Sequence, residues 1–71
     1  MYNVIIYRGD VNKRNIVGCI QSNMIPHTKS RVIYGNTVYL VEYVYIDYDV
    51  NVVHLRTSCV GMVDSTVYGH W

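Results

Sequence analysis

The chain has 71 residues, of which 51% are hydrophobic and only 15% are charged. Strand-forming residues dominate and Ala is absent, which excludes a helical bundle, a coiled coil and a long disordered tail. The formal net charge of +1 provides no electrostatic drive towards nucleic acid or an anionic membrane. Residues 1–71 therefore form a single small β domain.

A domain of this size buries only about 60% of the surface that its unfolded chain exposes. Such domains usually need a disulfide, a metal or a partner subunit. No signal-peptide pattern precedes the first strand-like run, so we expect a cytoplasmic protein in which Cys19 and Cys59 are reduced and buried. No apolar run approaches the roughly 20 residues of a transmembrane helix, so no membrane contact is expected. Oligomerisation is then the expected source of added stability.

The first half of the chain predicts two strands and a long connection. Residues 2–7 are apolar on both faces, which indicates a strand that is central or covered on both sides. Residues 8–14 form a polar loop, and residues 15–21 form the second strand. Gly18 within that strand predicts a bulge or a close backbone approach. Residues 22–30 are irregular.

The second half contains the longest strand. Residues 31–34 predict a short strand, and Gly35 and Asn36 a two-residue turn of type II′. Residues 37–47 alternate, with tyrosines around Val41 on the odd face and, apart from Glu42, aliphatic residues on the even face. We expect this long strand to bend. A turn and a further strand over residues 52–57 follow, with a possible sixth strand from Cys59 to Val63. In the tail, Val67, Tyr68 and Trp71 are too apolar to remain in water.

These elements predict an all-β fold, a five- or six-stranded antiparallel barrel or meander. An SH3-like barrel fits the length best. The alternative is a curled single sheet that dimerises face to face.

The segment from Gly35 to Leu55 resembles small β domains of phage and prophage genomes. It has a Gly turn, a strand of the form Tyr-x-Val-x-x-Val, an Asp-Tyr-Asp-x-Asn turn and a valine-rich strand. The resemblance covers about a third of the chain and implies a small phage-type protein, whose place of action would be the host cytoplasm. It brings no catalytic residues with it.

Sites for chemistry are sparse. Asp47, Asp49 and Asn51 alternate as in a calcium loop, but the required Gly and Glu are missing, so Asx-type turn bonds are the better interpretation. No Cys or His spacing indicates a metal site, and no nucleophile, base and acid stand together. Glu42 is predicted to pair with an Arg, to face a subunit boundary or to mark a pocket. We expect no enzymatic activity, no metal and no cofactor.

The tyrosines are the candidate binding residues. Tyr39, Tyr43 and Tyr45 are predicted to share one strand face, with Tyr48 just beyond it. An exposed face of this kind anchors proteins or stacks bases. Since few cations are available to form a basic groove, we expect a protein partner. The alternative is a small nucleotide- or nucleic-acid-binding barrel in which Arg31 or Arg56 meets phosphate.

Self-association is the remaining expectation. Many tyrosines must either crowd a small interior or leave an apolar patch in water. A symmetric dimer would cover the patch and pair the edge of the long strand over residues 37–47. Tyr43 and Tyr45 are predicted to lie at that contact, with Tyr43→Ala weakening it by roughly 1–3 kcal/mol.

Overall fold

The computed structural model describes residues 1–63, which form five β-strands and one short 3-10 turn. The elements are β1 (Tyr2–Arg8), η1 (Lys13–Asn15), β2 (Ile16–Ser22), β3 (Arg31–Tyr34), β4 (Thr37–Asp47) and β5 (Val52–Met62). The all-β prediction is confirmed. No helix in this part of the chain has the length and apolar character needed to cross a membrane.

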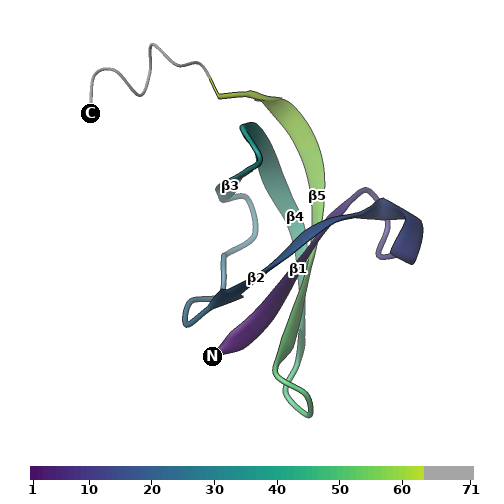
Figure 1. Cartoon of the computed structure of the whole chain (residues 1–71), viewed down its shortest axis with the longest axis vertical. Coiled ribbons are helices and arrows are strands. Elements are labelled where there is room, and N and C mark those ends of the chain that lie inside the picture. Colours follow the sequence, from purple (N-terminus) through teal and green to yellow (C-terminus); the bar gives the residue numbers. More distant parts are fainter. Residues whose placement is uncertain (64–71) are drawn as a thin grey trace.

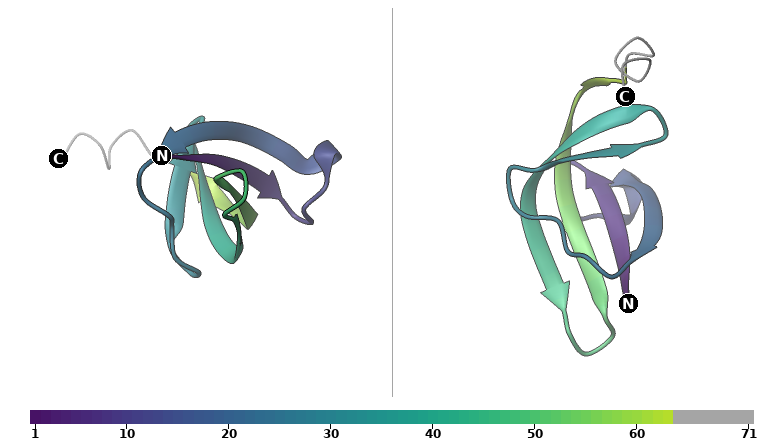
Figure 2. Two further views of the ribbon diagram at one scale, coloured as in Figure 1. Left: turned by 90° about the horizontal axis from the view of Figure 1, so that it is seen from below. Right: turned by 90° about the vertical axis from the view of Figure 1, so that its left-hand side faces the viewer.

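The strands form one sheet in the order β2-β1-β5-β4-β3. Neighbouring strands are antiparallel, except that β1 and β5 run parallel. The sheet curls on itself into a half-barrel, as Figures 1 and 2 show, which is consistent with a small SH3-like barrel. β1 lies between β2 and β5, so its predicted central position is confirmed.

The hydrophobic core lies on the inner, concave face of the sheet. Alternate residues of the three central strands point into it, and its fully buried members are Val4, Ile6, Val41, Val53 and Leu55. Burial of each such side chain contributes about 1.5–3 kcal/mol relative to exposure. Thr57 is also fully buried, and its hydroxyl donates a 2.8 Å hydrogen bond to the Tyr7 carbonyl. The inner face is thus filled without any charged side chain.

Gly18 is a point of close approach, one of the two alternatives predicted for it, and it lies next to a bulge whose extra residue is Val17. The β1–β2 register shifts between Ile6 and Tyr7, opposite this part of β2. On the inner face the ring of Tyr34 lies so near that a Cβ on Gly18 would be 2.4 Å from its Cζ. β2 and β3 are the two edges of the sheet, so this contact joins them across the core.

A second bulge decides which side chains of β4 reach the core. Glu42 is the extra residue, because Val41 pairs with Thr57 while Tyr43 pairs with Arg56. A bulge residue shifts the alternation of the strand. Odd residues before it, Tyr39 and Val41, are buried, whereas after it the even residues Val44 and Ile46 pack against the core.

Several local expectations need correction. Gly35 and Asn36 both have positive φ angles, of 56° and 63°, so the turn is type I′ rather than II′. Both cysteines are free but exposed, not buried, because Cys19 lies on the outer face and Cys59 near the end of β5. Residues 59–62 continue β5 instead of forming a sixth strand.

Two further expectations concern the loop and the tail. The polar loop before β2 contains η1, capped by the Asn12 side chain, which accepts a hydrogen bond from the Arg14 N–H. The predicted packing of Val67, Tyr68 and Trp71 falls outside the described residues.

Candidate functional site

The outer face of the sheet, opposite the core, carries two adjacent rows of large side chains. One row runs across β4, β5 and β1 as Tyr43, Arg56 and Tyr7, and the next as Tyr45, His54 and Ile5. We call these six residues the outer-face cluster. The parallel pairing of β1 with β5 creates it, because it brings residues about fifty positions apart into register.

Tyr43 and Tyr45 form the exposed part of this cluster. They are 55% and 48% exposed, and their ring centroids lie 6.4 Å apart with the planes 28° from parallel. The Arg56 guanidinium carbon is 5.4 Å from the Tyr43 ring centroid, within the range of a cation–π contact. The two rings are therefore held side by side and open to solvent.

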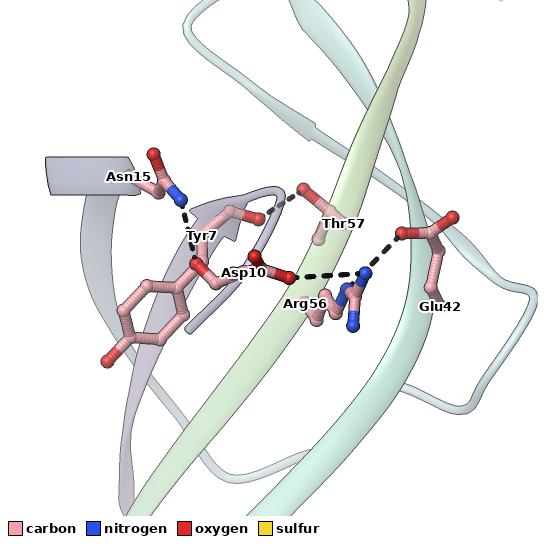
Figure 3. A network of polar contacts seen from close by, with 6 residues as sticks. All are labelled: Tyr7, Asp10, Asn15, Glu42, Arg56 and Thr57. Atoms are coloured by element: carbon pink, nitrogen blue, oxygen red, sulfur yellow. Dashed lines mark hydrogen bonds and ion pairs between the residues drawn. The ribbon is translucent and has the colours of Figure 1, made fainter. Parts of the chain in front are cut away.

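Arg56 is surrounded by acidic groups. Its Nη2 is 3.3 Å from Asp10 Oδ1, and its Nε is 3.9 Å from Glu42 Oε1 (Figure 3). The Nε atom is buried and has no hydrogen-bond partner within residues 1–63. Glu42 can reach Arg56 because the bulge removes it from the aliphatic face of β4. Of the three alternatives predicted for Glu42, pairing with an Arg is the one that the structure shows. Two carboxylates thus balance the single guanidinium.

Tyr7 and His54 form the covered part of the cluster. The Tyr7 hydroxyl and His54 Nδ1 are 2.7 Å apart, and the ring centroids lie 5.6 Å apart. In the tautomer with the ring proton on Nε2, the Tyr7 hydroxyl donates this hydrogen bond and Nδ1 accepts it. Burial, and secondarily the nearby Cys19, raises the pKa of the Tyr7 phenol. This pair lies beside the exposed part of the cluster, because His54 pairs with Tyr45 across the strands.

The structure brings together only some of the predicted binding residues. Tyr43, Tyr45 and Arg56 are neighbours, but Tyr39 is only 6% exposed and lies on the core side, so the prediction that it shares their face is wrong. Tyr48 is 70% exposed in the β4–β5 turn. Arg31 begins β3 opposite Leu40, at the far side of the outer face. The bulge at Glu42 is the physical reason for the separation of Tyr39.

Sequence reasoning missed four contributors to the site, namely Ile5, Tyr7, His54 and Asp10. Tyr7 and His54 meet only through the parallel β1–β5 pairing. Asp10 reaches Arg56 from the loop after β1. Alternation of His54 with buried Val53 and Leu55 was the one available signal that it faces outwards.

A separate feature, on the core side of the sheet, lies beside the C-terminal half of β4. The irregular segment before β3 forms a groove of about 340 Å³ with the strand, lined by Ile25, Pro26, His27, Thr28, Val44 and Ile46. In the described part of the chain, no three His, Cys, Asp or Glu side chains gather closely enough to hold a metal ion. At the nearby turn, Asp47 Oδ1 accepts a 3.0 Å hydrogen bond from the Asp49 N–H, which confirms the predicted Asx-type turn.

Comparisons with protein-family models, curated proteins and solved structures found no match. The functional interpretation of the outer face therefore comes from its own residues.

Proposed function

We propose that this chain is a non-enzymatic, phage-type accessory protein that binds another protein through the outer-face cluster. Its phage character, and with it a place of action in the host cytoplasm, rests on the resemblance of residues 35–55. The binding role rests on one observation, the adjacent exposed rings of Tyr43 and Tyr45.

The geometry of these rings suits a protein contact. Aromatic anchors dominate interface energetics, and the most effective ones are already held in place before binding. Here Arg56 lies against Tyr43, and the neighbouring strand β5 supports both rings. Since a paired tyrosine surface costs little side-chain entropy on binding, it is well suited to anchoring a partner.

The charge around the rings favours protein over nucleic acid. A nucleic-acid platform needs cations that are free to meet phosphate. Arg56 is balanced by Asp10 and Glu42, and Arg31 lies at the far side of the face. A small nucleotide- or nucleic-acid-binding barrel stays as the alternative because stacked, exposed rings also accept bases.

The direct test is capture from a lysate of the native host with wild-type protein and a Tyr43→Ala/Tyr45→Ala variant. We expect a protein captured by the wild type and lost with the double variant. Ile33→Ala is the matched control, since Ile33 is exposed on the outer side of the edge strand β3. Equal capture by both variants would contradict the proposal. Tyr48→Ala tests whether the binding surface extends to the turn.

Salt separates the two candidate functions. Binding to a single-stranded oligonucleotide should weaken steeply between low and moderate salt through counterion release. A tyrosine-centred protein contact should change little. Oligonucleotide binding that weakens with salt and is lost in the Tyr43→Ala/Tyr45→Ala variant would support the nucleic-acid-binding alternative instead.

A second copy of the chain is one protein that could occupy the outer-face cluster, as the sequence predicts. Sedimentation at micromolar concentration tests this: Tyr43→Ala should weaken a dimer of that kind by roughly 1–3 kcal/mol. A monomer of 8.2 kDa under those conditions would contradict it.

A further inference from the structure

The long strand β4, where the sequence predicts an edge for self-association, lacks a second neighbouring strand only over its second half. β4 is flanked by β3 and β5 over its first half, whereas β2 has a neighbour only on one side. The segment Ile16–Ser22 carries no charged residue and no proline. Natural proteins usually protect edge strands with such residues or with bulges. In β2 only a bulge is present, opposite Tyr7 at the N-terminal end, and it leaves residues 18–22 regular.

The hydrogen bonds of β1 show which backbone groups of β2 are free. The Asn3 N–H donates to Asn51 and the Gly9 N–H to Thr57, so the odd residues of β1 direct their backbone groups to the β5 side. The even residues then face β2, where their partners are Gly18, Ile20 and Ser22. Hence Cys19 and Gln21 direct their N–H and C=O groups away from the sheet. Within residues 1–63 those groups have no hydrogen-bond partner.

We propose that β2 pairs antiparallel with β2 of a second copy around a two-fold axis at Ile20. In this register Cys19 exchanges both backbone hydrogen bonds with Gln21 of the second copy, and Ile20 lies opposite itself. The register uses only the regular segment 18–22 and avoids the bulge. No charge opposes a like charge, because the strand has none.

The side chain that β2 carries on the inner face at this edge also suits pairing with an identical strand. Ile20 is an apolar side chain that is 41% exposed, and pairing with itself would remove it from water. Self-pairing at a non-hydrogen-bonded position brings the two Cα atoms to about 4.5 Å, so the side chains touch. The edge therefore supplies, within a single strand, both the backbone partners and the apolar contact of a dimer.

The arrangement has a consequence for binding. Directly paired residues lie on the same face of a sheet, so the two outer faces would continue into one surface. Each copy would then carry its own Tyr43–Tyr45 pair on that outer surface, making the dimer bivalent. This consequence rests on the proposed function, but the dimer itself does not.

Cysteine cross-linking tests the register. In the Cys59→Ser background, Gln21→Cys places a thiol opposite Cys19 of the second copy at a Cα separation of about 5.5 Å, which suits a disulfide. Under mild oxidation by diamide, which takes up the two thiol hydrogens, we expect a covalent dimer. Adding Cys19→Ser is the matched control and should abolish it, since two thiols at position 21 are out of register.

A second experiment measures the edge directly by sedimentation at micromolar concentration. Gln21→Pro removes an outward N–H that β1 does not use, so the fold should remain while dimerisation weakens tenfold or more. Gln21→Ala should dimerise normally, and so should Tyr43→Ala/Tyr45→Ala, which distinguishes this edge from the outer-face cluster. Monomeric wild-type protein, dimers insensitive to Gln21→Pro, or oxidation linking Cys19 to itself would each overturn the proposal.

Discussion

The ring of Tyr34 lies directly over Gly18, so that one side chain from β3 closes the half-barrel against β2. The two residues belong to opposite edges of a five-stranded sheet and share no strand pairing. The absence of a side chain at Gly18 is what permits the contact. The curvature of the sheet is therefore coupled to a glycine in an edge strand.

Gly18→Ala is expected to destabilise the fold by about 1–3 kcal/mol, because the new methyl group would overlap the Tyr34 ring and force it to move. Urea denaturation followed by circular dichroism measures the change. Tyr34→Ala alone also costs stability, but in that background Gly18→Ala should cost little. Additive effects of the two substitutions would show that the ring is not the obstacle.

Asn36→Ala is expected to cost about 1–2 kcal/mol, since Asn36 has a φ of 63° and a left-handed conformation is unfavourable for Ala. Asn36→Gly should be neutral or slightly stabilising. A type II′ turn would need a positive φ only at its first central residue, Gly35, and would tolerate Ala at the second. Thermal unfolding of both variants therefore distinguishes the observed turn from the one the sequence suggested.

We expect the raised pKa of Tyr7 to make the folded state less stable at alkaline pH. Its pKa is raised above the ordinary 10.0, first by burial and second by Cys19, so the folded state keeps the phenol proton where the unfolded chain has lost it. The contribution of the protonated Tyr7 phenol to the free energy of unfolding is complete below about pH 10. It falls as the pH rises towards the pKa of Tyr7 in the folded state.

Urea denaturation from about pH 8 to about pH 11 measures this dependence. Tyr7→Phe should show a shallower decline than the wild type over the upper part of the range. Tyr45→Phe alters an exposed ring that pairs with His54 across the strands, and its stability should decline with pH as that of the wild type does. Parallel curves for wild type and Tyr7→Phe would contradict the prediction.

Composition and alternation were sufficient to predict the fold class and the position of the long strand, because both are set locally. The parallel pairing of β1 with β5 was not predictable in this way, as it joins the first strand to the last. Nor was the bulge at Glu42, which no glycine or proline marks. One extra residue there reverses the faces of β4, so Tyr39 enters the core while Tyr43 and Tyr45 leave it.

The candidate site was likewise predictable from the sequence only in part. Exposure of Tyr43 and Tyr45 follows from too many aromatic residues for a small interior, which composition reveals. The residues around these two rings do not follow from composition. Tyr7 reaches His54 from β1, and Asp10 reaches Arg56 from the loop after β1. The type of surface could be anticipated, but its members required the sheet topology.

Arg56 provides the final prediction, since its role in stability and its role in binding should separate. Its ion pairs to Asp10 and Glu42 involve partly or largely exposed side chains, and such pairs contribute little. Its buried Nε has no hydrogen-bond partner in the described part of the chain, which offsets the cation–π contact with Tyr43. Arg56→Met keeps the aliphatic packing and should therefore change the free energy of unfolding by less than about 1 kcal/mol.

Binding should respond differently to the same substitution. Without the guanidinium, Asp10 and Glu42 leave uncompensated negative charge beside Tyr43, and that ring loses a contact that holds its orientation. We expect a captured protein partner to bind Arg56→Met about tenfold more weakly, a difference of about 1.4 kcal/mol. Arg31→Met is the control, because Arg31 lies at the far side of the same face. A large loss of stability in Arg56→Met, or equal binding by both variants, would show that Arg56 supports the sheet rather than the outer-face cluster.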